Sequence, residues 1–273
     1  MRMIATQDYG WSQLAARAGL AWPAAVPWAM ERAVQAGFDA WEPFLKTADD
    51  AKRVGGLVRA HGLAMPSVFV AGVLFDEAQA GTVMDRIVTL AAEAALFGCE
   101  KVMIYPEPHR QGKKTERDLI TQARNLERLA QRLSGLTLLY HAEEPEMAER
   151  AHEYEHVLTH TDPALVRLCL DPDAAWRGSR LDTPALIELM ARHADRTDAI
   201  HMRQSQVGVW AEVVGPGDMP LADIAALIRD RDPLVVVEHA YEAATPATLD
   251  PVEAHRQSIG FVRSIFSIET AAS

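Results

Sequence analysis

Three apolar runs in the second half of the chain each end in a side chain that can bind a metal ion or transfer a proton. The first run is followed by Asp171, the second by His201, and the third by Glu238. Carboxylate oxygens with one imidazole suit a divalent cation such as Mn, Mg or Co, with Zn also possible, whereas a thiolate-rich set would suggest structural zinc. Carboxylates that converge without a cation would repel one another strongly. The recurrence therefore predicts a metal site built at the ends of neighbouring strands.

Other polar side chains stand at comparable points of the sequence. Glu42 follows an apolar run and precedes a proline, so it either contacts the ligand or accepts hydrogen bonds within its loop. Arg203 lies two residues after His201 and either steadies a substrate oxyanion or forms a salt bridge on the rim. A further run ends at His141, with Glu143 and Glu146 close behind it.

The elements that must position these residues alternate between short apolar runs and longer stretches of helical periodicity. We expect strands at residues 2–6, 38–42, 64–70, 101–105, 136–141, 166–170, 199–203 and 234–238. We expect helices at residues 27–36, 48–61, 82–97, 115–133, 145–159, 184–193, 221–229 and 251–266. Parallel strands are connected by helical crossovers, and strands that are buried on both faces have mostly apolar sequences. Eight such units predict a (β/α)8 TIM barrel, an α/β fold, with residues 1–273 as a single domain.

Composition narrows the class of ligand. A chain of 273 residues with 49% hydrophobic content can bury one large core, and a formal net charge of −11 argues against a nucleic-acid partner. No stretch reaches the roughly 18 unbroken apolar residues of a membrane span, and the opening residues lack a signal-peptide core, so we expect a cytoplasmic protein without membrane contact. Cys99 and Cys169 lie far apart beside apolar runs, which indicates buried free thiols.

Several strings together resemble the xylose-isomerase-like TIM-barrel superfamily, in the branch of sugar phosphate isomerases and epimerases. The resemblance covers about residues 9–262. The strings that carry it are residues 37–42, 114–119 with Gln122, 140–147, 170–171 with Arg177 and Gly178, 201–205, 208–218 and 237–238. Together they are specific to the superfamily, and they are not specific to a substrate.

This resemblance implies one divalent metal ion held by residues from strands five to eight. The positions that carry over are Glu146, Asp171, His201 and Glu238. Strand five leaves an alternative, because His141 stands at the strand end whereas Glu146 follows five residues later at the start of a helix.

Relatives often read His-Asn-His in this segment, and they often carry an aromatic residue three positions after the strand-six aspartate. Here Glu143 takes the place of the second histidine and Ala174 that of the aromatic, with Trp176 nearby. We therefore expect a more acidic, reshaped pocket in which His141, Glu143, Arg203, Glu42 and Trp176 contact a small carbohydrate.

A hard cation would stabilise the enediolate that forms when an α-proton leaves a ketose or keto-polyol. We expect Glu238 as the first proton-transfer group, with Glu146 or Glu143 as the second. A sugar isomerase or epimerase is the leading prediction. A lyase or dehydratase of a keto-sugar or keto-inositol shares the enolate step, and a non-catalytic binding barrel is the third alternative.

The resemblance also implies a possible homodimer or homotetramer. Trp210 is a candidate lid or subunit-contact residue, and strand alternation predicts that His239 packs against a helix.

Overall fold

The computed structural model describes residues 3–109 and 112–267. Eight parallel strands form one sheet in the order β2-β1-β10-β7-β6-β5-β4-β3, and isolated bridges between Ala40 and Ala64 and between Phe44 and Phe69 join its two edges into a barrel. The strands are β1 (Ile4–Gln7), β2 (Ala40–Glu42), β3 (Ser67–Gly72), β4 (Lys101–Pro106), β5 (Thr137–His141), β6 (Val166–Leu170), β7 (Thr197–Met202) and β10 (Leu234–Val237). The predicted TIM barrel is confirmed.

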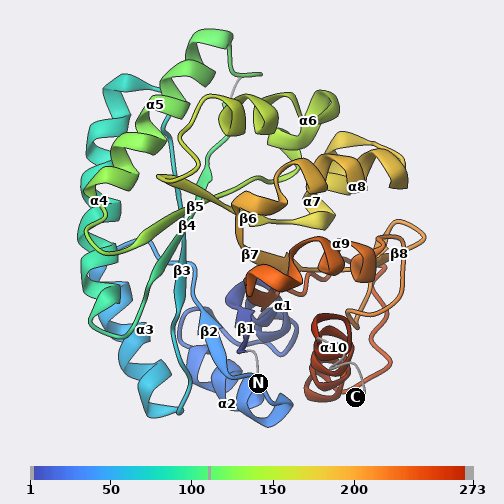
Figure 1. Cartoon of the computed structure of the whole chain (residues 1–273). Helices are drawn as coiled ribbons and strands as arrows, with labels where there is room; N and C mark the ends of the chain where they lie inside the picture. Colours follow the sequence, from blue (N-terminus) through green and yellow to red (C-terminus); the bar gives the residue numbers. More distant parts are fainter. Residues whose placement is uncertain (1–2, 110–111, 268–273) are drawn as a thin grey trace, which may run out of the picture.

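Helices surround the strands (Figure 1). They are α1 (Asp8–Arg17), α2 (Val26–Ala36), α3 (Ala48–Ala60), α4 (Glu77–Ala95), α5 (Glu116–Arg132), α6 (Glu144–Thr159), α7 (Pro172–Ser179), α8 (Thr183–Arg192), α9 (Leu221–Ile228) and α10 (Pro251–Phe266). In the part of the chain that the structure describes, no helix is long and apolar enough to cross a membrane.

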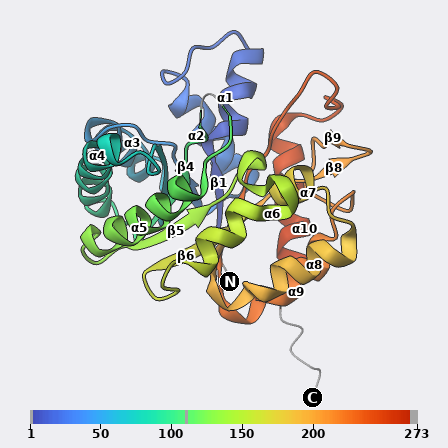
Figure 2. The ribbon, with the colours of Figure 1, turned by 90° about the horizontal axis from the view of Figure 1, so that it is seen from above.

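Two helices and one hairpin were not expected from the sequence. α1 follows β1, with the Gln7 side chain accepting from Tyr9 N, and α7 follows β6, capped by Asp171. An Asp-Pro pair starts α7, the same N-terminal signal as in α10. β8 (Ser205–Gln206) and β9 (Val209–Trp210) form the hairpin. Figure 2 shows it at the same end of the barrel as α1.

Most expected strands and helices lie where the sequence placed them, and the differences are at their ends. The strand expected at residues 64–70 is observed at Ser67–Gly72, because Pro66 interrupts the hydrogen-bonding run. The first expected strand begins at Arg2, which lies outside the described residues.

α6 is interrupted between its first turn and its main body. Ala148 is extended, and Glu149, Arg150 and Ala151 have φ values of 53°, 63° and 67°. Left-handed conformation costs a residue with a Cβ roughly 1–2 kcal/mol. The break separates the turn that carries Glu146 from the helix that covers the barrel.

The interior of the barrel is filled by one buried side chain from each strand. This inner layer consists of Ala5, Ala40, Phe69, Met103, Leu139, Cys169, Ala199 and Val236. A larger apolar core lies between the strands and the helices and includes Trp11, Met30, Leu90 and Ile224. Cys99 and Cys169 are both buried and free, as predicted, and burial raises the pKa of the Cys169 thiol to about 11.

Candidate active site

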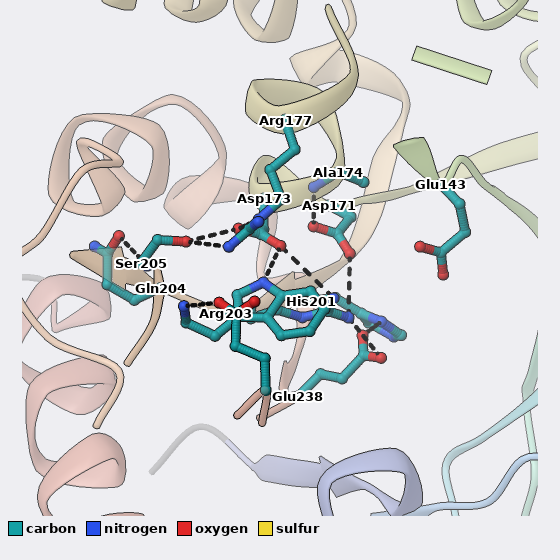
Figure 3. A network of polar contacts seen from close by, with 12 residues as sticks. Glu143, Asp171, Asp173, Ala174, Arg177, His201, Arg203, Gln204, Ser205 and Glu238 are labelled. Carbon is teal, nitrogen blue, oxygen red and sulfur yellow. Dashed lines mark hydrogen bonds and ion pairs between the residues drawn. The ribbon is translucent and has the colours of Figure 1, made fainter. Parts of the chain in front are cut away.

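Strand alternation places the candidate site residues directly beyond the inner layer. Successive side chains of a strand point to opposite faces, so the residue two positions further on points into the barrel again. Two residues after the inner-layer members of four strands come His141, Asp171, His201 and Glu238. Glu42 follows Ala40 in the same way. The carboxyl ends of the strands therefore carry one ring of polar side chains, part of which is drawn in Figure 3.

Four members of this ring lie close enough to share one ion. Each of His141, Asp171, His201 and Glu238 offers a ligand atom, and these atoms lie within 4.8 Å of one another. His141 Nε2 is 3.6 Å from Asp171 Oδ2. All four residues are buried, with exposed fractions between 0% and 5%.

Several of these atoms have no hydrogen-bond partner among the described residues. They are both ring nitrogens of His141, Asp171 Oδ2 and His201 Nε2. A buried polar atom without a partner costs about 1–3 kcal/mol, and buried charged groups cost more. Unpaired nitrogen and oxygen lone pairs that face one another are what a divalent cation would satisfy, so these residues fit a metal ion.

The His201 ring is held between two carboxylates. Its Nδ1 lies 2.7 Å from Glu238 Oε2, and its Nε2 lies 2.8 Å from Glu42 Oε1 without the angles of a hydrogen bond. Ser67 Oγ donates to the other oxygen of Glu42 at 2.5 Å. Burial lowers the pKa of His201, but Cys169, Glu42 and Glu238 together raise that pKa well above its usual value.

Arg203 neutralises part of the negative charge at this end of the barrel. Its Nη2 is 2.8 Å from Glu238 Oε1 and 4.0 Å from Asp171 Oδ2, and its Nη1 is 3.6 Å from Asp173 Oδ2. Burial raises the pKa of Glu238, but Arg203 and His201 outweigh it, so the pKa of Glu238 lies below its usual value. Glu238 therefore carries a full negative charge at neutral pH.

Asp173 connects the site to the hairpin. Trp210 Nε1 donates to its Oδ2 at 3.0 Å, while Arg177 Nε and Ser205 Oγ donate to its Oδ1 at 3.1 and 3.2 Å. The guanidinium of Arg177 lies 4.6 Å from the Trp210 ring centroid. Sequence reasoning offered Trp210 as a lid or subunit-contact residue and gave Asp173 no role at the site. The acidic residue two positions after Asp171 was the available signal.

Glu146 lies outside the group of four. Its Oε2 accepts from Glu143 N at 3.1 Å, and its Oε1 lies 3.8 Å from Lys114 Nζ. Lys114 Nζ also donates to Glu153 Oε1 at 2.6 Å. Burial raises the pKa of Glu146 to about 8, although Lys114 lowers it. His141 belongs to the group of close ligand atoms and Glu146 does not, so the metal-ligand role of Glu146 stays a prediction that its position does not favour.

The remaining predicted contacts divide between the site and the core. Glu143 lines the cavity described below, with its Oε1 3.8 Å from His141 Nδ1. Trp176 packs, partly buried, against the apolar core and does not line that cavity. His239 turns away from the site, as predicted, and its Nε2 lies 3.0 Å from Ser258 Oγ of α10.

A cavity of about 1020 Å³ opens over the ring of polar residues. Its wall includes Arg203, Glu238, Glu143 and Trp210 at the site, and residues of α1, α2 and α3 further out. Asp8 also lines it, and burial raises the pKa of this carboxyl to about 8. Sequence reasoning missed Asp8 because the helix that begins there was not predicted.

The model of one protein family, described as xylose isomerase-like TIM barrel, matches residues 30–265. No curated protein matches the sequence.

Several solved structures share the fold at low sequence identity. A sugar phosphate isomerase/epimerase from Parabacteroides distasonis has a TM-score of 0.74 and 17% identity over 96% of this chain and 94% of its own. The 3-keto-D-glucoside 4-epimerase of E. coli has a TM-score of 0.69 and 15% identity, with 97% of this chain and 100% of its own covered. The IOLI protein, solved with a bound zinc atom, has a TM-score of 0.68 and 15% identity over the whole of both chains.

Proposed function

Because the chain belongs to the xylose isomerase-like TIM-barrel family, we propose that it is a sugar isomerase or epimerase that depends on a divalent metal ion. Its substrate class is a ketose or keto-polyol from which a proton next to the carbonyl is removed. The observation that carries this proposal is the buried group of four ligand atoms within 4.8 Å, with unpaired lone pairs, one of whose members, Glu238, lines a large cavity.

The residues that would hold the ion are His141, Asp171, His201 and Glu238. Two carboxylates and two imidazoles suit Mn, Co or Zn better than Mg, which prefers oxygen ligands alone. When bound, the ion supplies a Lewis acid that stabilises the negative charge developing on substrate oxygens. The zinc found in the IOLI structure is in keeping with a site of this kind.

Two carboxylates at the cavity can move the proton. Glu238 is held by His201 and Arg203, so the direction of its carboxylate is fixed. Glu143 lines the same cavity from the loop after β5, and Figure 3 draws it apart from Glu238. We propose that Glu238 removes the α-proton and that Glu143 returns a proton on another side of the substrate. Arg203 would steady the substrate oxygen on which charge develops.

The neighbours support a carbohydrate substrate. One acts on 3-keto-D-glucosides, and another is described as a sugar phosphate isomerase/epimerase. Identity of 15–17% with these two carries the fold and leaves the substrate to experiment. A net charge of −11 is also in keeping with a small-molecule ligand rather than nucleic acid.

The first experiment is elemental analysis of the purified protein, followed by calorimetric titration with Mn²⁺, Co²⁺ and Zn²⁺. We expect about one ion per chain, bound more weakly at acid pH because protons compete for the imidazoles and carboxylates. Absence of any ion, together with absence of binding on addition, would remove the basis of the proposal.

The second experiment follows hydrogen exchange in heavy water with ketoses and 3-keto-glucosides. The wild type with its metal should exchange the hydrogen next to the carbonyl, and Glu238→Gln should lose on the order of 10²–10⁴ in rate. Exchange at the wild-type rate in the variant would move the base to Glu143. Elimination of a β-substituent instead of isomerisation would favour a lyase.

A further inference from the structure

The cavity extends well beyond the residues that the reaction needs. Its volume of about 1020 Å³ lies at the top of the roughly 300–1,000 Å³ range of sites for drug-sized molecules. We propose that its outer part binds the apolar, ring-bearing substituent of a glycoside, so that the substrate is a keto-glycoside rather than a free ketose. This inference rests on the proposed function, because it assumes that a sugar ring occupies the inner part.

A continuous path of aromatic rings leads outward from the candidate metal ligands. The Phe69 ring centroid lies 5.0 Å from that of His141 and 5.9 Å from that of His201. The Phe44 ring packs edge-on against Phe69 at 5.8 Å. Both phenylalanines line the cavity. Because Glu238, Phe69 and Phe44 line the same cavity, a ligand whose reacting carbons lie beside Glu238 reaches Phe44 with the part that lies beyond Phe69.

Phe44 is presented to the cavity by a fixed backbone. On either side of it, Leu45 N donates to Phe69 O and Phe69 N donates to Pro43 O, both at 2.9 Å. Phe44 N itself donates to Asp8 Oδ2 at 3.1 Å. Although the barrel holds it on both sides, the residue is 41% exposed. A rigid and half-exposed aromatic ring inside a cavity indicates a binding surface rather than a packing residue.

The rest of the outer wall is also mainly apolar. Besides Phe44, its apolar members are Trp22, Pro23, Val26, Leu45 and Val54, and its polar members include Tyr9, Ser12, Lys46, Asp50 and Arg53. A free sugar is covered with hydroxyl groups, and each of these needs a hydrogen-bond partner when it is buried. The wall offers such partners chiefly through Lys46, Asp50 and Arg53, and Arg53 Nη2 is already 3.3 Å from Asp50 Oδ1. Apolar ring atoms would fill this space without leaving polar groups unpaired.

The outer part of the cavity is continuous with the inner part that holds the sugar, and this continuity indicates what kind of group fills it. The outer and inner parts are one cavity, so a group that fills the outer part can be covalently joined to the sugar in the inner part. A glycosidic bond provides that connection and stays intact during epimerisation of the sugar ring. The outer wall then contributes binding energy from a part of the substrate that does not react.

The test compares two glucosides that share the sugar and differ in the substituent. Calorimetry with the Mn²⁺-loaded full chain gives the Kd of methyl β-glucoside and of phenyl β-glucoside. We expect the phenyl compound to bind about ten-fold tighter or more, since burying the ring against Phe44 and Trp22 removes apolar surface from water. Phe44→Ala should bring the ratio of the two Kd values close to one while leaving the Kd of methyl glucoside unchanged.

Val34→Ala provides the matched control, because Val34 is a 44% exposed apolar residue of α2 that does not line the cavity. Its ratio should equal that of the wild type. Should Phe44→Ala fail to fold, Phe44→Leu keeps an apolar side chain and should lose part of the preference. Equal Kd values in the wild type, no binding of phenyl glucoside, or an unchanged ratio in both Phe44 variants would overturn the subsite. A preference for a carboxyphenyl over a phenyl glucoside that disappears in Lys46→Ala would replace it with an anion subsite.

Failure of this inference is distinguishable from failure of the proposed function. Loss of the phenyl preference leaves hydrogen exchange with free ketoses untouched. Absence of exchange with every keto-sugar, in contrast, leaves the Kd ratio measurable.

Discussion

Two buried groups of carboxylates lie close to the end of β5, and their negative charges are balanced in different ways. In the first, Glu146 and Glu153 converge on Lys114, whose side chain is 2% exposed. In the second, Asp171 and Glu238 face two histidines whose ring nitrogens are partly unpaired, and the only guanidinium within 4.0 Å of these two carboxylates among the described residues is that of Arg203. The first group brings its own central cation. The second leaves an arrangement of donors that a metal ion completes.

The comparison teaches that a buried carboxylate near a strand end is not by itself a metal ligand. Lys114 pairs with Glu153 at 2.6 Å, and burial raises the pKa of Glu146 to about 8. At neutral pH, Lys114 therefore balances one carboxylate and the other keeps its proton. We expect the Lys114 group to support the fold and the group around His201 to support function.

The largest effect should come from removing the internal cation. Lys114→Met leaves the Glu153 carboxylate, whose side chain is 15% exposed, without its cation and with Gln122 Nε2 as a remaining donor at 2.9 Å. We therefore expect a loss of up to about 3–5 kcal/mol in the free energy of unfolding, measured by urea denaturation. Lys113→Met is the control, because its side chain is 74% exposed and water screens its ion pair with the exposed Glu149. Equal losses in the two variants would mean that the Lys114 group has no special structural role.

The second prediction compares the two groups by the effect of their substitutions on Mn²⁺ affinity. His141→Asn should weaken Mn²⁺ binding by at least about 100-fold, since it removes one of four ligands, whereas Glu146→Gln should leave Kd within about three-fold. Asp171→Asn should resemble His141→Asn while keeping the oxygen that caps α7, where Ala174 N donates at 2.9 Å. Calorimetry measures all three values. The reverse order for His141 and Glu146 would place the strand-five ligand on Glu146, as the family resemblance implied.

The contrast between these two residues also shows what the sequence could and could not predict. The barrel was predictable because eight buried strands alternate with helices. Asp171, His201 and Glu238 were predictable because each directly follows the last apolar residues of a predicted strand. The motif at residues 140–147 favoured Glu146, but the alternation within β5 pointed to His141, two residues after the inner-layer Leu139.

Other features depended on contacts that no sequence pattern reveals. The break in α6 separates the turn that carries Glu146 from the rest of the helix. No residue type between Glu144 and Thr159 predicts the three left-handed residues at this break. Lys114 itself comes from the segment before α5, so its pairing with α6 is set by tertiary packing. Trp176 follows Asp171 more closely in sequence than Trp210 follows His201, so sequence distance favoured Trp176 as the contact residue. Only the hairpin of β8 and β9 brings Trp210 to the cavity.

A third prediction uses pH to separate the groups. The pKa of Glu146 is about 8 in the folded protein, above its ordinary value of 4.5. The folded state thus binds the proton more tightly, and the stability that this confers is lost as pH rises from about 4.5 to about 8. We expect Glu146→Gln to gain on the order of 3–4 kcal/mol relative to the wild type between pH 5 and pH 8.5. Glu77→Gln, an exposed carboxylate, should show no comparable gain.

The smallest expected effect concerns Trp210, which lies at the edge of the group of residues around His201. Trp210→Phe keeps an aromatic ring beside Arg177 and Arg203 but removes the Nε1 donor to Asp173. Asp173 keeps Arg177 and Ser205 as donors, so the loss should be that of one hydrogen bond, about 0.5–1.5 kcal/mol.

Because Trp210 lines the cavity without belonging to the four ligands, we expect KM to rise about two- to ten-fold while kcat and the Kd of Mn²⁺ stay the same. Trp28→Phe is the matched control, since Arg32 lies 4.1 Å from the Trp28 ring centroid and Trp28 does not line the cavity. A change in metal affinity with Trp210→Phe would show that Asp173 and the hairpin belong to the metal group. The metal group would then extend further toward the hairpin than the distances around His201 indicate.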